Sequence, residues 1–109
     1  MVRIGHVTGV PLSIRSERRG TAQHVAPRGE LDIATAELLE TELAAAQASD
    51  ADTIVLDLSG LTFIDSTGLR IVLDFNERCG RLRVIAGAPA VERLLDVVGL
   101  RERLPLISP

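Results

Sequence analysis

The segment Leu61–Arg70 gathers the side chains best suited to carry chemistry in this sequence. An apolar pair leads into Asp65 and Ser66, which open a predicted helix. One interpretation is that Asp65 or Ser66 is the helix N-cap and satisfies free amides of the first turn. The other is that Ser66 presents a surface hydroxyl at the positive end of a helix, where an attached phosphate would be stabilised. The residues alone leave both roles open.

Two further positions belong with this group. Gly68 lies inside the first turn of the same helix, where glycine costs about 1 kcal/mol of helix stability relative to alanine. We interpret that choice as keeping the helix amides or a neighbouring hydroxyl open to access. The second position is Asp32, at the end of the run Gly29–Asp32, which can either cap the next helix or take part in surface recognition.

Several kinds of catalysis lack the residues that they require. All 12 basic residues are arginines, which excludes a lysine-containing phosphate loop, a Schiff base and a lysine general base. Ser66 is not in a Gly-x-Ser-x-Gly elbow, and both histidines, His6 and His24, precede it. Asp57 ends a buried strand as a response-regulator phosphoacceptor does, but that family also uses a lysine and an early acidic pair. We therefore predict that the protein is not an enzyme.

Cofactor and metal sites are equally unsupported. The sequence contains no Gly-x-Gly-x-x-Gly dinucleotide loop between its last strand and helix patterns. Its single cysteine, Cys79, is expected to be a small core residue rather than a reactive thiol. Since the two histidines are also far apart in sequence, we expect no cofactor and no metal.

Composition narrows the class of partner. The 109 residues carry a net charge of −3, and Phe63 and Phe75 are the only aromatic residues. A surface that stacks bases or follows phosphates is therefore not expected, and no nucleic acid is predicted as a partner. No stretch approaches the roughly 18 apolar residues of a membrane span, and residues 1–11 do not resemble a signal peptide. The expectation is a cytoplasmic protein without a membrane contact.

The hydrophobic pattern alternates between strand and helix signals. Strands are predicted at 12–15, 24–28, 53–58 and 82–86, a hairpin turn at 18–21, helices at 35–48, 66–79 and 89–99, and a short turn with a final strand in 101–107. This order predicts a single α/β domain with helices packed on a sheet. Because Pro27 lacks a backbone donor, the second strand should be at an edge, bulged, or ending there.

Helix periodicity predicts which residues face the core. The first helix has an apolar stripe, with its glutamates largely off it: Ala36, Leu39, Leu43 and Ala46 against Glu37, Glu40 and Glu42. The second helix has one side formed by Leu69, Val72, Leu73 and Asn76, and Gly80 is its expected stop. Pro89 suits the first turn of the third helix, which should end at Gly99.

Taken in order, four segments resemble the STAS domain, and more specifically the bacterial anti-sigma factor antagonists. The segments are Gly29–Ala36, Val55–Ser59, Phe63–Leu69 and Pro89–Leu100. The resemblance runs from about Leu12 to Ile107, nearly the whole chain. It implies a mixed sheet of about four to five strands with helices packed mainly on one face. Residues 12–107 would form the domain, and residues 1–11 an N-terminal extension or an extra strand.

The resemblance also implies a binding role that is controlled by phosphorylation. In that family the serine after the aspartate at the start of the second helix is phosphorylated by the partner, an anti-sigma factor serine kinase, and Ser66 occupies that position. The unphosphorylated antagonist binds the anti-sigma factor and frees the sigma factor, and a serine phosphatase resets the phosphorylated form. The residues expected at the partner-binding surface are Asp32, Asp65, Thr67, Gly68, Leu69 and Arg70.

The expected mechanism is electrostatic rejection with little change of shape. A phosphate on Ser66 adds about −1.5 to −2 charges beside Asp32 and Asp65. Arg70 either lies over that phosphate and softens its charge or is a solvated helix residue. The alternative function within the family is a STAS scaffold or regulatory subunit of a stress-sensing or other signalling complex.

Besides Arg70, two further features depart from the family pattern. Pro27 stands where relatives usually place a strand aliphatic residue, which questions the pairing of that strand. The sequence also ends at Pro109, where many relatives continue into a last helix. If that helix is missing, an exposed apolar strip would favour self-association, so a weak homodimer is included among the expected partners.

Overall fold

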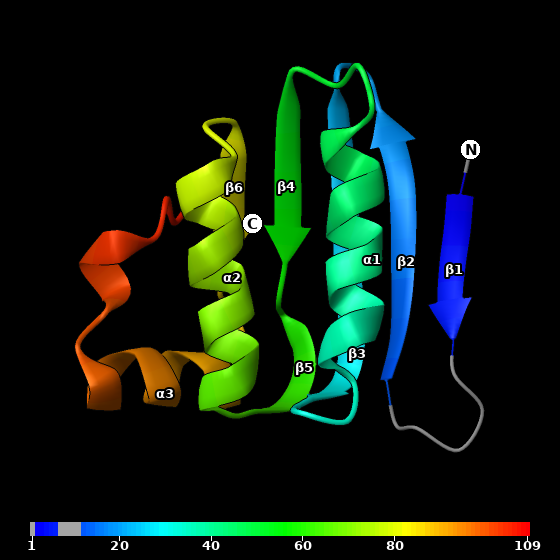
Figure 1. The fold of residues 1–109 in the computed structure, drawn as a ribbon. Coiled ribbons are helices and arrows are strands. Elements are labelled where there is room, and N and C mark those ends of the chain that lie inside the picture. Colours follow the sequence, from blue (N-terminus) through cyan, green and yellow to red (C-terminus); the bar gives the residue numbers. More distant parts are fainter. Residues whose placement is uncertain (1, 7–11) are drawn as a thin grey trace.

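A mixed β-sheet forms the framework of the computed structural model, which describes residues 2–6 and 12–109 (Figure 1). The strands are β1 (Val2–His6), β2 (Leu12–Arg19), β3 (Ala22–Leu31), β4 (Thr53–Asp57), β5 (Gly60–Ile64) and β6 (Leu82–Ile85). The order is β1-β2-β3-β4-β6, and β5 pairs with β3 beyond β4. The first three strands are antiparallel, whereas β4 and β5 run parallel to β3, and β6 runs parallel to β4.

Three α-helices and one short 3₁₀ helix complete the described part of the chain. They are α1 (Ala36–Gln47), α2 (Ser66–Arg78), α3 (Pro89–Val98) and the 3₁₀ turn Arg101–Arg103. Figure 1 shows α1 and α2 side by side on one face of the sheet, with α3 at the lower left, beside the end of α2 where that helix begins. The predicted α/β class and the mixed sheet are confirmed, and the strands from Leu12 onward number five, within the predicted four to five. Strand β5 at Gly60–Ile64, however, was not among the predicted strands. Strand β1 lies within the predicted segment 1–11, of which residues 1 and 7–11 fall outside the described residues.

The first hairpin is longer than predicted. Strands β2 and β3 pair over eight residue pairs, from Leu12 with Gly29 to Arg19 with Ala22. The turn between them contains Gly20 with a φ of 61°, the left-handed conformation that glycine adopts without strain. The predicted turn was therefore correct, and its flanking charged residues continue the strands.

Of the three alternatives for the strand that contains Pro27, two are wrong: the strand neither ends at Pro27 nor lies at an edge of the sheet, and only an irregularity of the bulge type is found near it. Strand β3 continues to Leu31 in the middle of the sheet, with Ile14 of β2 beside Pro27. On its other side, β3 pairs with β4 up to Val25 and with β5 from Arg28 onward. Pro27 thus lies where the neighbouring strand changes, and the missing N–H removes no ladder hydrogen bond on that side. A register irregularity follows between Gly29 and Glu30.

The apolar stripes of the helices form the core against the sheet, with two corrections. The predicted stripe of α1 is buried, but Glu42 is buried with it at 4% exposure instead of lying off it. In α2 the buried residues are Gly68, Leu69, Val72 and Phe75. The buried side of α2 is therefore shifted by about one residue from the predicted side, because Phe75 is buried in the position that the prediction gave to Asn76.

The helix ends follow their sequence signals except at Gly80. Helix α3 runs from Pro89 to Val98, and its C-cap is Gly99, which adopts the left-handed conformation with a φ of 69°. Helix α2 ends one residue before the expected stop, at a C-cap formed by Cys79. The tail forms the 3₁₀ turn and a single parallel bridge from Leu106 to Val84 in place of a final strand.

Within the described part of the chain, none of the helices is both long and apolar enough to cross a membrane.

Candidate functional site

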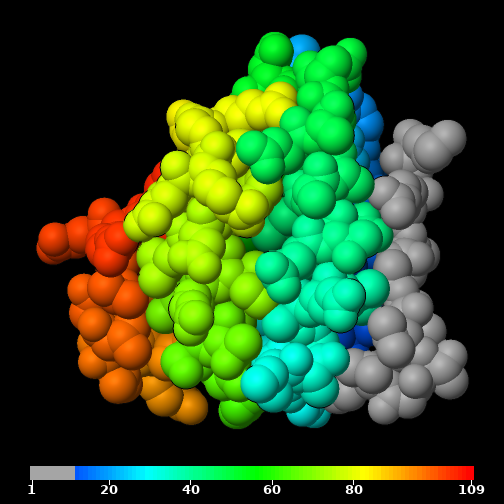
Figure 2. Space-filling model, viewed as in Figure 1, coloured from blue at the N-terminus to red at the C-terminus, as the bar shows by residue number. Residues whose placement is uncertain are grey.

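The two polar segments singled out in the sequence meet at one edge of the sheet. Strands β3 and β5 are parallel, and Leu31 pairs with Ile64 at their carboxyl ends. The amide of Asp65 donates to the carbonyl of Leu31 at 3.2 Å, which ties the second loop to the end of the first strand. Figure 2 shows the turn after β3 (cyan) beside the start of α2 (green) at the lower edge of the molecule.

Asp65, and not Ser66, is the N-cap of α2. Its Oδ1 accepts a hydrogen bond from the amide of Gly68 at 3.0 Å, and its backbone is extended, as an N-cap requires. Ser66 is the first helical residue and is exposed. Within the described residues, the amides of Ser66 and Thr67 have no acceptor, so two donors remain at the positive end of this helix. The hydroxyl of Ser66 is therefore free of any capping role.

Gly68 is present for packing rather than for access, which corrects our interpretation. The residue is buried, and a Cβ built on it would lie 2.8 Å from Cγ of Leu31 and 3.1 Å from Cγ1 of Ile64. A real Cβ does not approach carbon atoms that closely. Glycine at this position allows the first turn of α2 to lie directly on the ends of β3 and β5, and this close contact fixes where Ser66 sits.

Asp32 organises the turn that leads into α1. Its Oδ1 accepts from the amides of Ala34 at 2.9 Å and Thr35 at 3.2 Å. The hydroxyl of Thr35 donates to the carbonyl of Glu30 and accepts from the amide of Asp32, both at 2.9 Å. Asp32 is therefore not the N-cap of α1, as the capping alternative required. The N-cap is Thr35, which makes no side-chain cap, and Asp32 caps the turn that precedes the helix.

The remaining predicted site residues divide into exposed and buried ones. Arg70 is exposed and, among the described residues, makes no hydrogen bond or ion pair. It lies four residues after Ser66, which places the two side chains on the same face of the helix. Thr67 is half-buried. Leu69 is only 3% exposed and packs in the core, so its side chain cannot contact a partner and should be removed from the predicted binding set.

One residue of this edge escaped the sequence analysis. Ile33, inside the turn that Asp32 organises, is 79% exposed. A signal for it was present, because the pair Ile33-Ala34 lies between the polar turn residues Asp32 and Thr35, where no helix or strand pattern accounts for an isoleucine. Ile33 adds an apolar side chain to a surface that otherwise presents a hydroxyl, carboxylates and a guanidinium.

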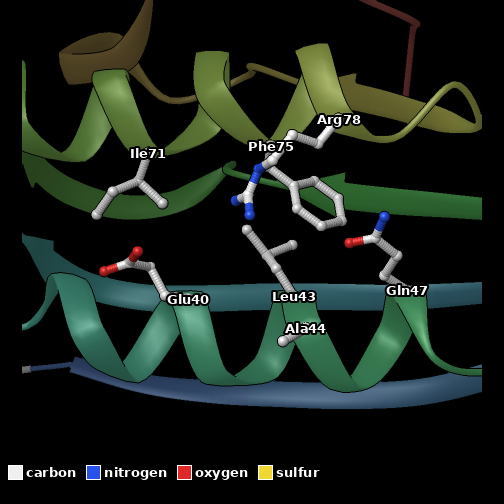
Figure 3. Close-up of a pocket in the computed structure, with 7 residues that line it drawn as sticks. All are labelled: Glu40, Leu43, Ala44, Gln47, Ile71, Phe75 and Arg78. Atoms are coloured by element: carbon white, nitrogen blue, oxygen red, sulfur yellow. The ribbon is translucent and has the colours of Figure 1, made fainter.

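A shallow groove runs between α1 and α2 (Figure 3). It has a volume of about 220 Å³. The picture shows Leu43 and Phe75 at its floor, while Glu40, Gln47 and Arg78 lie along its rim. Because both helices start at the edge that carries Ser66, the groove leads away from that edge along the same face of the molecule.

Alternative candidate residues have structural roles. Asp57 accepts hydrogen bonds from the amide of Ser59 at 3.0 Å and from its hydroxyl at 2.6 Å, so it shapes the turn before β5. Cys79 is 3% exposed, in agreement with the predicted core role. In the part of the chain that the structure describes, no three His, Cys, Asp or Glu side chains gather in a way that could hold a metal ion.

Comparison with known proteins defines the class. The family model described as "Mlab, STAS domain" matches residues 14–108. A crystal structure of an anti-sigma factor antagonist from Mycobacterium paratuberculosis superposes with a TM-score of 0.81 at 32% identity, covering 90% of this chain and 86% of that one. The unphosphorylated form of the antagonist SpoIIAA shares the fold, with a TM-score of 0.66 at 22% identity over 87% of this chain and 88% of that one.

Curated relatives narrow the class further. The anti-sigma F factor antagonist of Paenibacillus polymyxa is 34% identical over 100 residues, which are 87% of this chain and 86% of that protein. The anti-sigma-F factor antagonist RsfB of Mycobacterium tuberculosis is 31% identical over 83 residues, 73% of this chain and 68% of that protein. The chain belongs to the STAS domain family, among relatives that are named anti-sigma factor antagonists. It is a regulatory protein rather than an enzyme, as the sequence predicted.

Proposed function

We propose that this protein antagonises an anti-sigma factor that is also a serine kinase, and that phosphorylation of Ser66 ends their contact. The observation that carries the proposal is an exposed serine at the first position of α2, beside two aspartates held in fixed turns. Relatives with more than 30% identity that are named antagonists support the same role. The free antagonist binds the anti-sigma factor, and the sigma factor is released.

A neutral Ser66 suits a partner surface that fits closely at this edge. The carboxylates of Asp32 and Asp65 are already engaged by backbone amides, so the loops keep their shape without a partner. A surface that is ordered in advance loses little conformational entropy on binding. The hydroxyl therefore lies on a preformed surface that the kinase can reach.

Phosphorylation changes the charge of this edge more than its geometry. The phosphate brings about −1.5 to −2 charges, and the unengaged amides of Ser66 and Thr67 are donors suited to receive it. The partner then meets a negative cluster formed by the phosphate, Asp32 and Asp65. Like charges placed together at an interface cost several kcal/mol, and each 1.4 kcal/mol lowers affinity tenfold. Removal of the phosphate by a serine phosphatase restores binding.

The test is to incubate the protein with ATP and a purified anti-sigma factor kinase from the same bacterium, and to locate the phosphate by mass spectrometry. Phosphate is expected on Ser66. Ser66→Ala should bind the kinase and remain unmodified, whereas Ser66→Asp should bind at least 100-fold more weakly. Ser108→Ala, which changes an exposed serine of the C-terminal tail, is the matched control and should behave as the wild type.

The assignment of Ser66 is lost if both Ser66 variants bind and accept phosphate as the wild type does. A protein that binds no anti-sigma factor but is recovered in a complex with other STAS proteins would instead support the scaffold function.

A further inference from the structure

Ile33 is the most exposed large hydrophobic side chain among the described residues, at 79%. It lies in the turn between β3 and α1, next to the loop that holds Ser66. Its neighbours of similar size are buried, with Leu31 at 0%, Ile64 at 6% and Leu69 at 3% exposure. The turn thus exposes the side chain of Ile33 to solvent, although the neighbouring aliphatic side chains are buried in the core.

The turn that carries Ile33 is fixed from both sides. The carboxylate of Asp32 accepts from the amides of the two residues that follow Ile33, Ala34 and Thr35. The hydroxyl of Thr35 holds the carbonyl of Glu30, and the carbonyl of Leu31 is held by the amide of Asp65. The backbone at position 33 is therefore ordered in the free protein, and a partner that binds the side chain need not order the loop.

The fold itself does not explain an isoleucine here. No core residue depends on a side chain that is four-fifths exposed, and polar residues are preferred in turns of this kind. Single exposed hydrophobic residues are common on protein surfaces and by themselves carry no meaning. What distinguishes Ile33 is its position beside the proposed phosphorylation site, on a rigid turn and within reach of whatever protein approaches Ser66.

We propose that Ile33 is the aliphatic anchor by which the anti-sigma factor recognises this chain, an inference that rests on the function proposed above. The partner would present an apolar pocket beside its binding site for Ser66. Aromatic anchors are scarce in this chain, since Phe75 is 2% exposed and Phe63, which is 46% exposed, lies within β5 rather than in the turn. In the turn between β3 and α1, the side chain of Ile33 is therefore the large apolar group that a partner can contact.

The anchor and the phosphorylation site then have separate tasks. Ile33 contributes affinity and selects the partner, while the charge state of Ser66 decides whether the contact persists. Because Ile33 does not touch the reacting hydroxyl, its loss should weaken docking without slowing phosphate transfer in the docked complex. It is a specificity-determining residue, and its signature is a raised KM with an unchanged kcat.

The experiment measures both binding and phosphorylation of the full chain by the anti-sigma factor kinase that binds the wild type. Ile33→Ala, which removes three carbon atoms, should raise both Kd and the KM for phosphorylation about 60-fold, or 2.4 kcal/mol, with kcat unchanged. Ile33→Val should weaken binding only about fourfold, the effect of one buried methylene group. Val97→Ala is the matched control, because Val97 is 77% exposed but lies on α3.

The outcomes separate this inference from the function on which it rests. A wild-type protein that binds no anti-sigma factor contradicts the proposed function. A wild-type protein that binds, together with an Ile33→Ala variant of equal Kd and KM, overturns the inference and leaves the function intact. An equal loss of binding in Val97→Ala also overturns it, since exposed aliphatic residues would then contribute without regard to position. The urea midpoint of each variant should match the wild type, because none of these side chains packs in the core.

Discussion

At the scale of single residues, the geometry of the site depends on Gly68, which has no side chain. Gly68 lets the first turn of α2 rest on Leu31 and Ile64, and any Cβ at this position would come within 3.1 Å of both. The same turn carries the Asp65 cap and the exposed Ser66. The position of the Ser66 hydroxyl, the proposed phosphorylation site, is thus set by van der Waals contact between Gly68 and the strand ends.

Replacing Gly68 should therefore destabilise the protein. Gly68→Ala would gain helix propensity but force a methyl group to 2.8 Å from Cγ of Leu31, and overpacking of this kind costs about 1–3 kcal/mol. Urea denaturation measures the change in the free energy of unfolding. Gly80→Ala is the control, because a Cβ at Gly80 meets nothing within 4 Å and its φ is not positive. Equal stability of the two variants would contradict the packing role of Gly68.

Sequence reasoning located this site but could not assign every role within it. Asp32, Asp65 and Ser66 were recognisable because capping chemistry and order along the chain are local properties. The packing role of Gly68 was not, since it depends on Leu31, which is distant in sequence. Ile33 was missed and Leu69 was wrongly assigned to the binding surface for the related reason that exposure is decided by how elements pack, and a sequence pattern gives it only approximately.

At the scale of secondary-structure elements, β3 connects most of the sheet. It pairs with β2 on one side and with β4 and then β5 on the other. The sequence analysis underestimated the length of β3, because a proline usually ends a strand or lies in a strand at the edge of a sheet. The change of partner from β4 to β5, which accommodates the proline, arises from the parallel pairing of distant segments and leaves no local signal.

His24, near the start of β3, should make stability depend on pH. Burial lowers the pKa of its imidazole and Arg19 lowers it further, while Asp57 and Glu17 act in the opposite direction. Above about pH 6.5, His24 is neutral in both states. As the pH falls below this value, the unfolded chain takes up the proton first, so the folded state loses stability until the pH reaches the lowered pKa.

Urea unfolding at pH 7.5 and pH 5.5 tests this dependence. The loss of unfolding free energy between the two values should be smaller in His24→Gln than in the wild type, because the glutamine cannot bind a proton. Comparing the two proteins removes the contribution of the carboxylates, which both contain. The same loss in both would show that His24 titrates alike in the folded and unfolded chains.

At the scale of the whole molecule, the proposed switch acts by charge on a rigid body. The sheet, α1 and α2 share one core, and both site loops are attached to it by hydrogen bonds and close packing. The first turn of α2 tolerates a negative group, because anions are stabilised at helix N-termini. Nothing in this arrangement requires the fold to change when Ser66 is modified.

The variant Ser66→Asp should accordingly keep the wild-type structure and stability while it loses binding. Its free energy of unfolding should lie within about 0.5 kcal/mol of the wild type, as is usual for a surface substitution. Changes in amide chemical shifts measured by NMR should be confined to residues 32–35 and 65–70. Shifts that spread through β4 and β6 would contradict electrostatic rejection and point to a conformational switch.

The turn between β3 and α1 has a consequence for how such proteins diversify. Its shape depends on the side chains of Asp32 and Thr35, whereas Ile33 and Ala34 are exposed and contribute no side-chain hydrogen bond. Selectivity is a difference between affinities, so a change at one such exposed position can alter it without disturbing the fold. A bacterium that duplicates this gene could thus insulate parallel signalling pathways from crosstalk by substitutions at two adjacent codons.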